Sequence, residues 1–254
     1  MSIKLAFEVV GDGPPVVILH GLFGAGRNWA PIAQALGHAY RCYLPDARNH
    51  GASPWAEAMA YPDMALDVLA LIEREQLQQP ILIGHSMGGK TAMALALEHP
   101  QAIAGVAVID IAPERYGDQL SPYLTAMRHL SAETPMNFPA PSLRGHEERF
   151  DWRINLMATA VCMPDLCGFP QPLLRKHYSG PALFIAGADS GYVRAESHAD
   201  IKRLFPGARL AHIDDAAHWV HADQPEALAQ ALHGWLGELT DPRAGQALST
   251  LAAH

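Results

Sequence analysis

The sequence predicts an α/β fold in which helices cover a mostly parallel sheet, and two observations support this class. Short apolar runs alternate along the chain with longer segments of helical period, the order expected of parallel strands with helical connections. Two of the runs, residues 16–19 and 81–83, contain no polar residue, as is typical of strands buried on both faces. The chain has 254 residues, which suits one α/β domain with an insertion as well as two domains.

The same apolar runs and helical patterns predict the individual strands and helices. Strands are expected at residues 3–10, 16–19, 40–44, 80–83, 103–109, 182–186 and 209–213, and helices at residues 28–36, 61–76, 91–99, 196–205 and 225–239. The segment 61–76 is the clearest helix, because Met64, Val68 and Leu71 recur at helical spacing. Pro100 is a typical residue to end the helix expected at residues 91–99.

Residues 113–180 break this alternation. We find no convincing strand there, prolines are frequent, and Trp152, Met157 and Phe169 suggest amphipathic helices. An insertion after the strand ending at Ile109 would lie over the C-terminal edge of the sheet, where ligands bind in such folds. We therefore expect a core of residues 1–112 and 181–240, a helical cap at 113–180, and a flexible C-terminal tail at 241–254.

The composition excludes several classes of protein. Hydrophobic residues make up 49% and charged residues 17% of the chain, which excludes a disordered or coiled-coil protein. The net charge of −8 without a run of Lys or Arg disfavours nucleic acids and anionic membranes as partners. Three cysteines, no signal-peptide pattern and no apolar stretch of about 20 residues favour a cytoplasmic location. No H-E-x-x-H motif occurs, so we expect neither a metal nor a cofactor.

The sharpest motif is Gly-His-Ser-Met-Gly at residues 84–88. It matches G-x-S-x-G directly after a buried strand and directly before a helix, the context that a nucleophile elbow needs. A plain Gly-rich turn could have the same sequence, but the flanking strand and helix favour Ser86 as a catalytic nucleophile. Residues 84–91 also fit the phosphate-loop formula G-x-x-x-x-G-K-[ST], with Asp110 as a magnesium ligand. That alternative gives no role to the His-Gly pair at residues 20–21 or to a late histidine.

A serine nucleophile needs a general base, which in this chain order comes last. His218 follows the final expected strand and is the candidate, with His212 and His221 as competitors. The acid is ambiguous from spacing alone: Asp110 ends the 103–109 strand, and Asp189 lies one residue before the usual acid position, which Ser190 occupies. Either carboxylate could orient the imidazole.

The oxyanion hole is expected to consist of backbone N–H groups. Met87, directly after the nucleophile, supplies one, and Leu22 or its neighbour Phe23 in the loop after residues 16–19 supplies the other. Arg48 and its neighbours in residues 46–53 are expected to pin a loop near the entrance, with His50 as a candidate pocket wall. Phe23, Trp152 and Met157, together with Leu22, are candidates for an apolar acyl pocket.

These motifs resemble the α/β-hydrolase superfamily and, more narrowly, the bacterial YbfF-type esterases. The matching stretches are residues 20–24, 46–51, 84–90, 110–113 and 217–221. The resemblance implies the α/β-hydrolase fold and Asp110 as the triad acid. Asp189, whose carboxylate is a departure from the family pattern, stays as the alternative acid. It also explains Lys90 without a phosphate.

We therefore expect a serine hydrolase that cleaves carboxylic esters through an acyl-enzyme, using Ser86, His218 and Asp110. The resemblance suggests short-chain acyl esters or acyl thioesters as substrates. We also expect a monomer or weak homo-oligomer. The alternatives are C–C bond hydrolysis or acyl transfer on the same triad, or a receptor of the same fold that binds a ligand with little turnover.

Overall fold

The computed structural model of the chain describes residues 1–118, 120–129, 143–146 and 149–240, so the predicted tail at 241–254 lies outside the described residues. Its centre is a seven-stranded sheet in the order β1-β3-β2-β4-β5-β8-β9. The strands are β1 (Phe7–Val10), β2 (Pro15–Leu19), β3 (Arg41–Pro45), β4 (Ile81–His85), β5 (Gly105–Ile109), β8 (Ala182–Gly187) and β9 (Ala208–Ile213). Only β1 runs antiparallel to its neighbour. The prediction of a mostly parallel sheet is confirmed.

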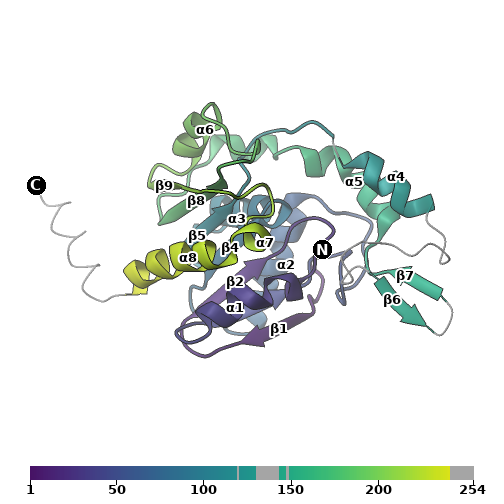
Figure 1. Ribbon diagram of the computed structural model, residues 1–254, viewed down its shortest axis with the longest axis horizontal. Helices are drawn as coiled ribbons and strands as arrows, with labels where there is room; N and C mark the ends of the chain where they lie inside the picture. The colour runs from purple at the N-terminus through teal and green to yellow at the C-terminus, as the bar shows by residue number, and fades with distance from the viewer. Residues whose placement is uncertain (119, 130–142, 147–148, 241–254) are drawn as a thin grey trace, which may run out of the picture.

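Helices cover both faces of this sheet (Figure 1). The α-helices of the described residues are α1 (Ala30–Leu36), α2 (Tyr61–Arg74), α3 (Met87–Glu98), α4 (Ser121–His129), α5 (Leu156–Cys167), α6 (Ser197–Leu204), α7 (Val220–Asp223) and α8 (Pro225–Thr240). Among the described residues, none of the helices is both long and apolar enough to cross a membrane.

Alternate residues of the central strands enter two separate cores. Val16 and Ile18 of β2 pack in the core that contains α1 and α8, which lie in front of the sheet in Figure 1. Val17 and Leu19 pack in the core that contains α2 and α3, on the opposite face. The side chains of a strand alternate between the two faces, so a strand covered on both sides must be apolar throughout, as the sequence indicates.

Most predicted boundaries differ from the structure by no more than two residues, and two differ by four. The first strand begins at Phe7 rather than Ile3, because the N–H groups of Ile3 and Ala6 donate to side-chain oxygens of Asp67 and Ser53 instead of a neighbouring strand. Helix α3 begins at Met87 rather than Thr91. The sequence pattern missed its first turn because that turn contains Gly88 and Gly89, and glycine has a low helix propensity.

The segment between β5 and β8 is more mixed than predicted. It contains α4 and α5, but also a hairpin of β6 (Leu143–His146) and β7 (Arg149–Trp152), visible at the right of Figure 1. The expectation that this segment holds no strand was wrong. Both strands are four residues long and contain charged residues, so they lack the apolar run or alternation by which a strand is recognised.

Candidate active site

The predicted site residues converge because parallel strands end at the same edge of the sheet. Ser86 follows β4, Asp110 follows β5, Ser190 lies in the loop after β8, and His218 lies in the loop after β9. The loop after β2 brings Leu22 to the same edge. Five chain segments that are distant in sequence therefore contribute to one region.

Ser86 has the backbone geometry of a nucleophile elbow. Its φ and ψ are 52° and −116°, a conformation that non-glycine residues rarely adopt and that is found mainly where function requires it. Its N–H donates to the carbonyl oxygen of Ile109 at 3.1 Å, and the next residue begins α3. The turn therefore directs the serine side chain out of the sheet at the N-terminus of a helix.

The imidazole of His218 connects the serine to a buried carboxylate. Its Nε2 lies 3.1 Å from Ser86 Oγ, and its Nδ1 lies 2.8 Å from Asp110 Oδ2. With Nδ1 protonated toward the carboxylate, Nε2 is free to accept the serine proton. The three residues thus have the geometry of a Ser-His-Asp triad.

Asp110, and not Asp189, is the carboxylate at the imidazole. It is fully buried, and its Oδ1 accepts the Gly187 N–H at 3.1 Å. Its Oδ2 accepts the Ser190 hydroxyl at 2.5 Å in addition to His218. Asp189 is exposed, and its backbone N–H donates to Ala216. A charge buried at this depth requires such partners, which the end of β8, the loop after it and the loop after β9 supply.

Two further side chains, which sequence reasoning did not single out, hold His218 in place. His85 Nε2–H donates to the backbone carbonyl of His218 at 2.8 Å, and burial lowers the pKa of His85 well below its ordinary value, so that this ring is neutral. The ring of Tyr192 stacks on the His218 imidazole with a centroid separation of 3.8 Å. The sequence offered one signal for each of these residues. His85 lies inside the G-x-S-x-G motif, and Tyr192 is an aromatic residue two positions after Ser190.

The loop after β2 is fixed beside Ser86 by a buried histidine. His20 Nε2 accepts the Ala47 N–H at 2.9 Å, so its Nδ1–H donates to the carbonyl oxygen of Gly21 at 2.8 Å. Burial lowers the pKa of His20, which keeps the ring in this neutral form. Phe23 has a φ of +66°, so the chain turns sharply just after Leu22. Met87, the first residue of α3, has an N–H that the helix itself leaves unpaired.

Two cavities adjoin Ser86. An outer cavity of about 90 Å³ is bordered by polar groups such as Asn28 and His221 as well as Phe23 and Trp219. An inner cavity of about 50 Å³ extends between α3 and α5 and is mainly apolar; its lining includes Ile111, Leu120, Met163 and Leu166. Leu22, Ser86, Leu120 and Tyr192 border both. Ser86 therefore lies where the two cavities meet.

Of the predicted pocket residues, the structure brings Leu22 and Phe23 to the outer cavity, but Trp152 and Met157 line neither cavity. Met157 is 58% exposed and borders a surface hollow with Trp55, because it lies on the outward face of α5. The indole N–H of Trp152 donates to the Met127 carbonyl within the inserted segment. His50 is fully buried and lines neither cavity.

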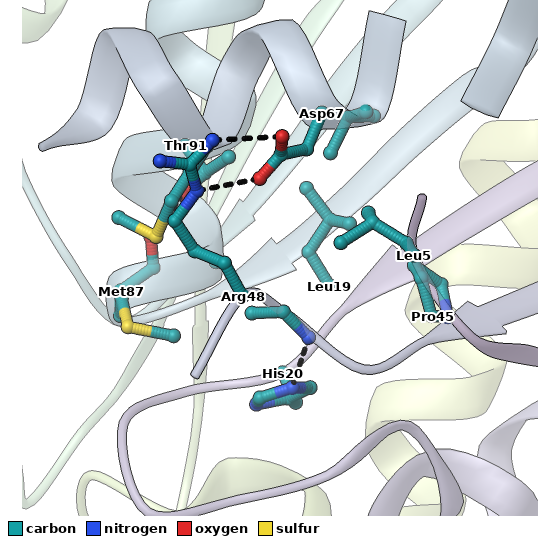
Figure 2. Close-up of a pocket in the computed structure, with 12 residues that line it drawn as sticks. Leu5, Leu19, His20, Pro45, Arg48, Asp67, Met87 and Thr91 are labelled. Atoms are coloured by element: carbon teal, nitrogen blue, oxygen red, sulfur yellow. Dashed lines mark hydrogen bonds and ion pairs between the residues drawn. The ribbon is translucent and has the colours of Figure 1, made fainter. Parts of the chain in front are cut away.

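A third cavity is lined by Met87 and by a buried ion pair. Figure 2 shows the guanidinium of Arg48 facing the carboxylate of Asp67, with Nε–Oδ2 and Nη2–Oδ1 distances of 2.6 and 2.8 Å. Arg48 also donates to the carbonyl oxygens of Met1, Ala58 and Asp63. At about 20 Å³, the cavity has room for about one water molecule. Arg48 therefore pins loops, as the sequence predicts.

Comparison with known proteins agrees with this architecture. A family model described as the alpha/beta hydrolase fold matches residues 14–137. A Xenopus tropicalis protein named sn-1-specific diacylglycerol lipase ABHD11 is 38% identical over 86% of this chain and 76% of its own length. The Escherichia coli protein named Esterase YbfF is 34% identical over 89% of this chain and 94% of its own length. The solved structure of a marine microorganism esterase superimposes with a TM-score of 0.87 at 32% identity, covering 92% of this chain and 100% of that one.

The chain belongs to the α/β-hydrolase family. The predicted fold is thereby confirmed. Within the family, the relatives named above carry the names esterase and lipase.

Proposed function

We propose that this α/β-hydrolase is a serine carboxylic-ester hydrolase that acts on small esters with short acyl chains, including acyl thioesters. The observation that carries the proposal is the hydrogen-bonded series from Ser86 through His218 to Asp110, at 3.1 and 2.8 Å. The names of the relatives, esterase and lipase, agree with this class of reaction.

In the proposed mechanism, Ser86 Oγ attacks the acyl carbonyl carbon while His218 Nε2 accepts the hydroxyl proton. Asp110 stabilises the imidazolium that forms. The N–H groups of Met87 and Leu22 donate to the developing oxyanion, in a site where fixed dipoles are effective because they need no reorganisation. His218 then gives its proton to the leaving alcohol or thiol. A water molecule releases the acyl group by the same steps in reverse order.

The two cavities suggest how a substrate lies. The inner cavity is the acyl site in this proposal, because its lining is mainly apolar. Its 50 Å³ corresponds to roughly three to five water-sized atoms at about 10–15 Å³ each, which is why short acyl chains are proposed. The outer cavity, with Asn28 and His221 at its border, is the site of the leaving group. The inserted segment acts as a cap over the inner cavity.

The test is hydrolysis of p-nitrophenyl acetate, butyrate and octanoate by the wild type and by Ser86→Ala. We expect release of p-nitrophenol with the shorter esters, and a loss of about 10⁶ in kcat for the variant, as in other serine hydrolases. As a control for stability, the melting temperature of Ser86→Ala should equal that of the wild type. Absence of release with all three esters would instead favour a receptor that binds without turnover, and release that persists in Ser86→Ala would exclude Ser86 as the nucleophile.

A further inference from the structure

Lys90 is a buried lysine that the mechanism above does not use. It lies on the first turn of α3, where its backbone N–H donates to the carbonyl oxygen of Ser86, and it is 1% exposed. An ammonium group buried at this depth is unfavourable unless it is paired and hydrogen-bonded. The partners of the Lys90 ammonium group therefore indicate its role.

All three hydrogen bonds of this ammonium group lead into the inserted segment. Nζ donates to the carbonyl oxygens of Glu114 at 2.9 Å, Cys167 at 3.3 Å and Gly168 at 2.6 Å. Cys167 and Gly168 stand at the C-terminal end of α5, where carbonyl groups lack helical partners and the helix dipole favours a cation. Because an ammonium group has three donors, none is left for a phosphate, and the phosphate-loop alternative has no support here.

Aromatic residues complete the surroundings of Lys90 and reach the same end of α5. The ring centroids of Tyr116 and Tyr61 lie 4.7 and 5.6 Å from Nζ, within the range of cation–π attraction. The Tyr61 hydroxyl donates to the carbonyl oxygen of Leu166 at 2.6 Å, and burial raises the pKa of Tyr61, so it remains a donor. Side chains from α2 and α3 thus bind three consecutive carbonyl groups, 166–168.

The same end of α5 forms a wall of the inner cavity. Met163, Leu166 and Cys167 line this cavity from α5, and Lys90 and Tyr61 line it from the core. Its volume is only about 50 Å³, so a small outward movement of α5 would admit additional methylene groups. The distance between α3 and α5 therefore determines which acyl chains fit.

Resting on the proposed ester hydrolysis, we propose that Lys90 determines acyl-chain specificity: its ammonium group holds the C-terminal end of α5 against α3 and so fixes the far wall of the acyl site. Lys90 is then a positioning residue that acts through α5. Removal of its hydrogen bonds loosens that wall and allows longer acyl chains to enter.

The experiment compares kcat/KM for p-nitrophenyl octanoate and acetate in Lys90→Met, Lys90→Arg and Tyr61→Phe. The assays use pH 6, where Lys90 is protonated, since burial lowers its pKa to about 7. We expect the octanoate-to-acetate ratio of kcat/KM to rise about tenfold in Lys90→Met. This is the factor by which an apolar pocket discriminates for or against one or two methylene groups. Tyr61→Phe gives a smaller rise, and Lys90→Arg, which keeps the charge, stays near the wild type. Lys176→Met, which removes a partly exposed lysine from the same segment, leaves the ratio unchanged.

Hydrogen exchange of the α5 amides provides a second readout, independent of activity. Exchange near residues 163–168 becomes faster in Lys90→Met and in Tyr61→Phe but not in Lys176→Met. If Lys90→Met does not fold, Tyr61→Phe decides alone. An unchanged ratio or unchanged exchange in the folded variants overturns the inference and leaves the proposed function intact. Failure of the wild type to hydrolyse any ester in a Ser86-dependent manner overturns both.

Discussion

At the scale of single residues, the backbone conformation of Asp110 determines where its carboxylate lies. Its φ of +50° is unusual for a non-glycine residue and turns the chain just after β5, where its N–H donates to Ile185. The carboxylate then lies beside the imidazole of His218, and it also accepts hydrogen bonds from Ser190 and Gly187. Ser190 occupies the position at which the acid is common in such folds, so here that position stabilises a carboxylate from the neighbouring strand.

We predict that Asp110→Asn lowers kcat for p-nitrophenyl butyrate by about 10⁴, because an amide can hold the imidazole in the wrong tautomer. Asp189→Asn is the matched control, since its side chain is exposed and we expect kcat close to that of the wild type. Circular dichroism checks that both variants fold. A larger loss in Asp189→Asn than in Asp110→Asn would show that the triad uses the other carboxylate.

At the scale of elements, the turn from β4 into α3 depends on close packing of backbone against backbone. A Cβ atom on Gly88 would collide with the carbonyl group of Leu19 in β2, and one on Gly84 would collide with the carbonyl oxygen of Gly88. These glycines are therefore needed for the close approach of α3 to the sheet, and their role is separate from the reactivity of Ser86.

Gly→Ala substitutions are therefore predicted to have opposite effects in two helices. Gly88→Ala displaces α3 or β2 and lowers the free energy of unfolding by at least about 1–3 kcal/mol, the usual range for overpacking, with loss of esterase activity. Gly234 in α8 is exposed, with open space around a Cβ atom, so Gly234→Ala raises the free energy of unfolding by about 0.4–1 kcal/mol. Urea unfolding measures both. Equal effects of the two substitutions would contradict the role assigned to Gly88.

The same elements show what sequence could predict here. The apolar runs predicted the central strands, because a strand buried on both faces must be apolar at every position. The G-x-S-x-G motif predicted the turn before α3. Sequence did not place Met157, because which face of a helix points inward depends on how α5 packs. It did not place Trp152 either, because this residue lies on strand β7 and not on the amphipathic helix that was expected there. Nor did spacing alone separate Asp110 from Asp189, since the direction of a loop carboxylate depends on backbone torsions such as the positive φ of Asp110.

At the scale of the whole molecule, the C-terminal edge of the sheet concentrates uncharged histidines. His20 and His50 lie together, with ring centroids 5.2 Å apart, and His85 lies 5.0 Å from His221. Burial, together with the charge of a neighbouring histidine, lowers the pKa of His50 to about 3 and that of His221 to about 4. The folded protein therefore keeps these rings neutral at pH values at which the unfolded chain would protonate them.

This difference predicts a loss of stability in mild acid. Above the unfolded pKa of about 6.5 both states hold the rings neutral, so their contribution to stability is fully present. Below it the unfolded chain binds protons that the native state does not, and the free energy of unfolding falls by about 1.4 kcal/mol per pH unit for each such histidine. From pH 6.5 to pH 5, His50 alone accounts for about 2 kcal/mol. The loss continues until the pH reaches the folded pKa values, about 4 for His221 and about 3 for His50.

Urea unfolding at pH 7, 6 and 5 measures the slope, with His50→Asn as the informative variant. Because Asn does not titrate, this variant should lose stability less steeply below pH 6.5 than the wild type, whatever its stability at pH 7. His38→Asn is the matched control, since His38 is exposed, and it should retain the wild-type slope. If His50→Asn and the wild type had the same slope between pH 6.5 and 5, His50 would have to be protonated in the native state. A charged ring would then lie in a fully buried position beside His20, against the preference for neutral groups in such surroundings.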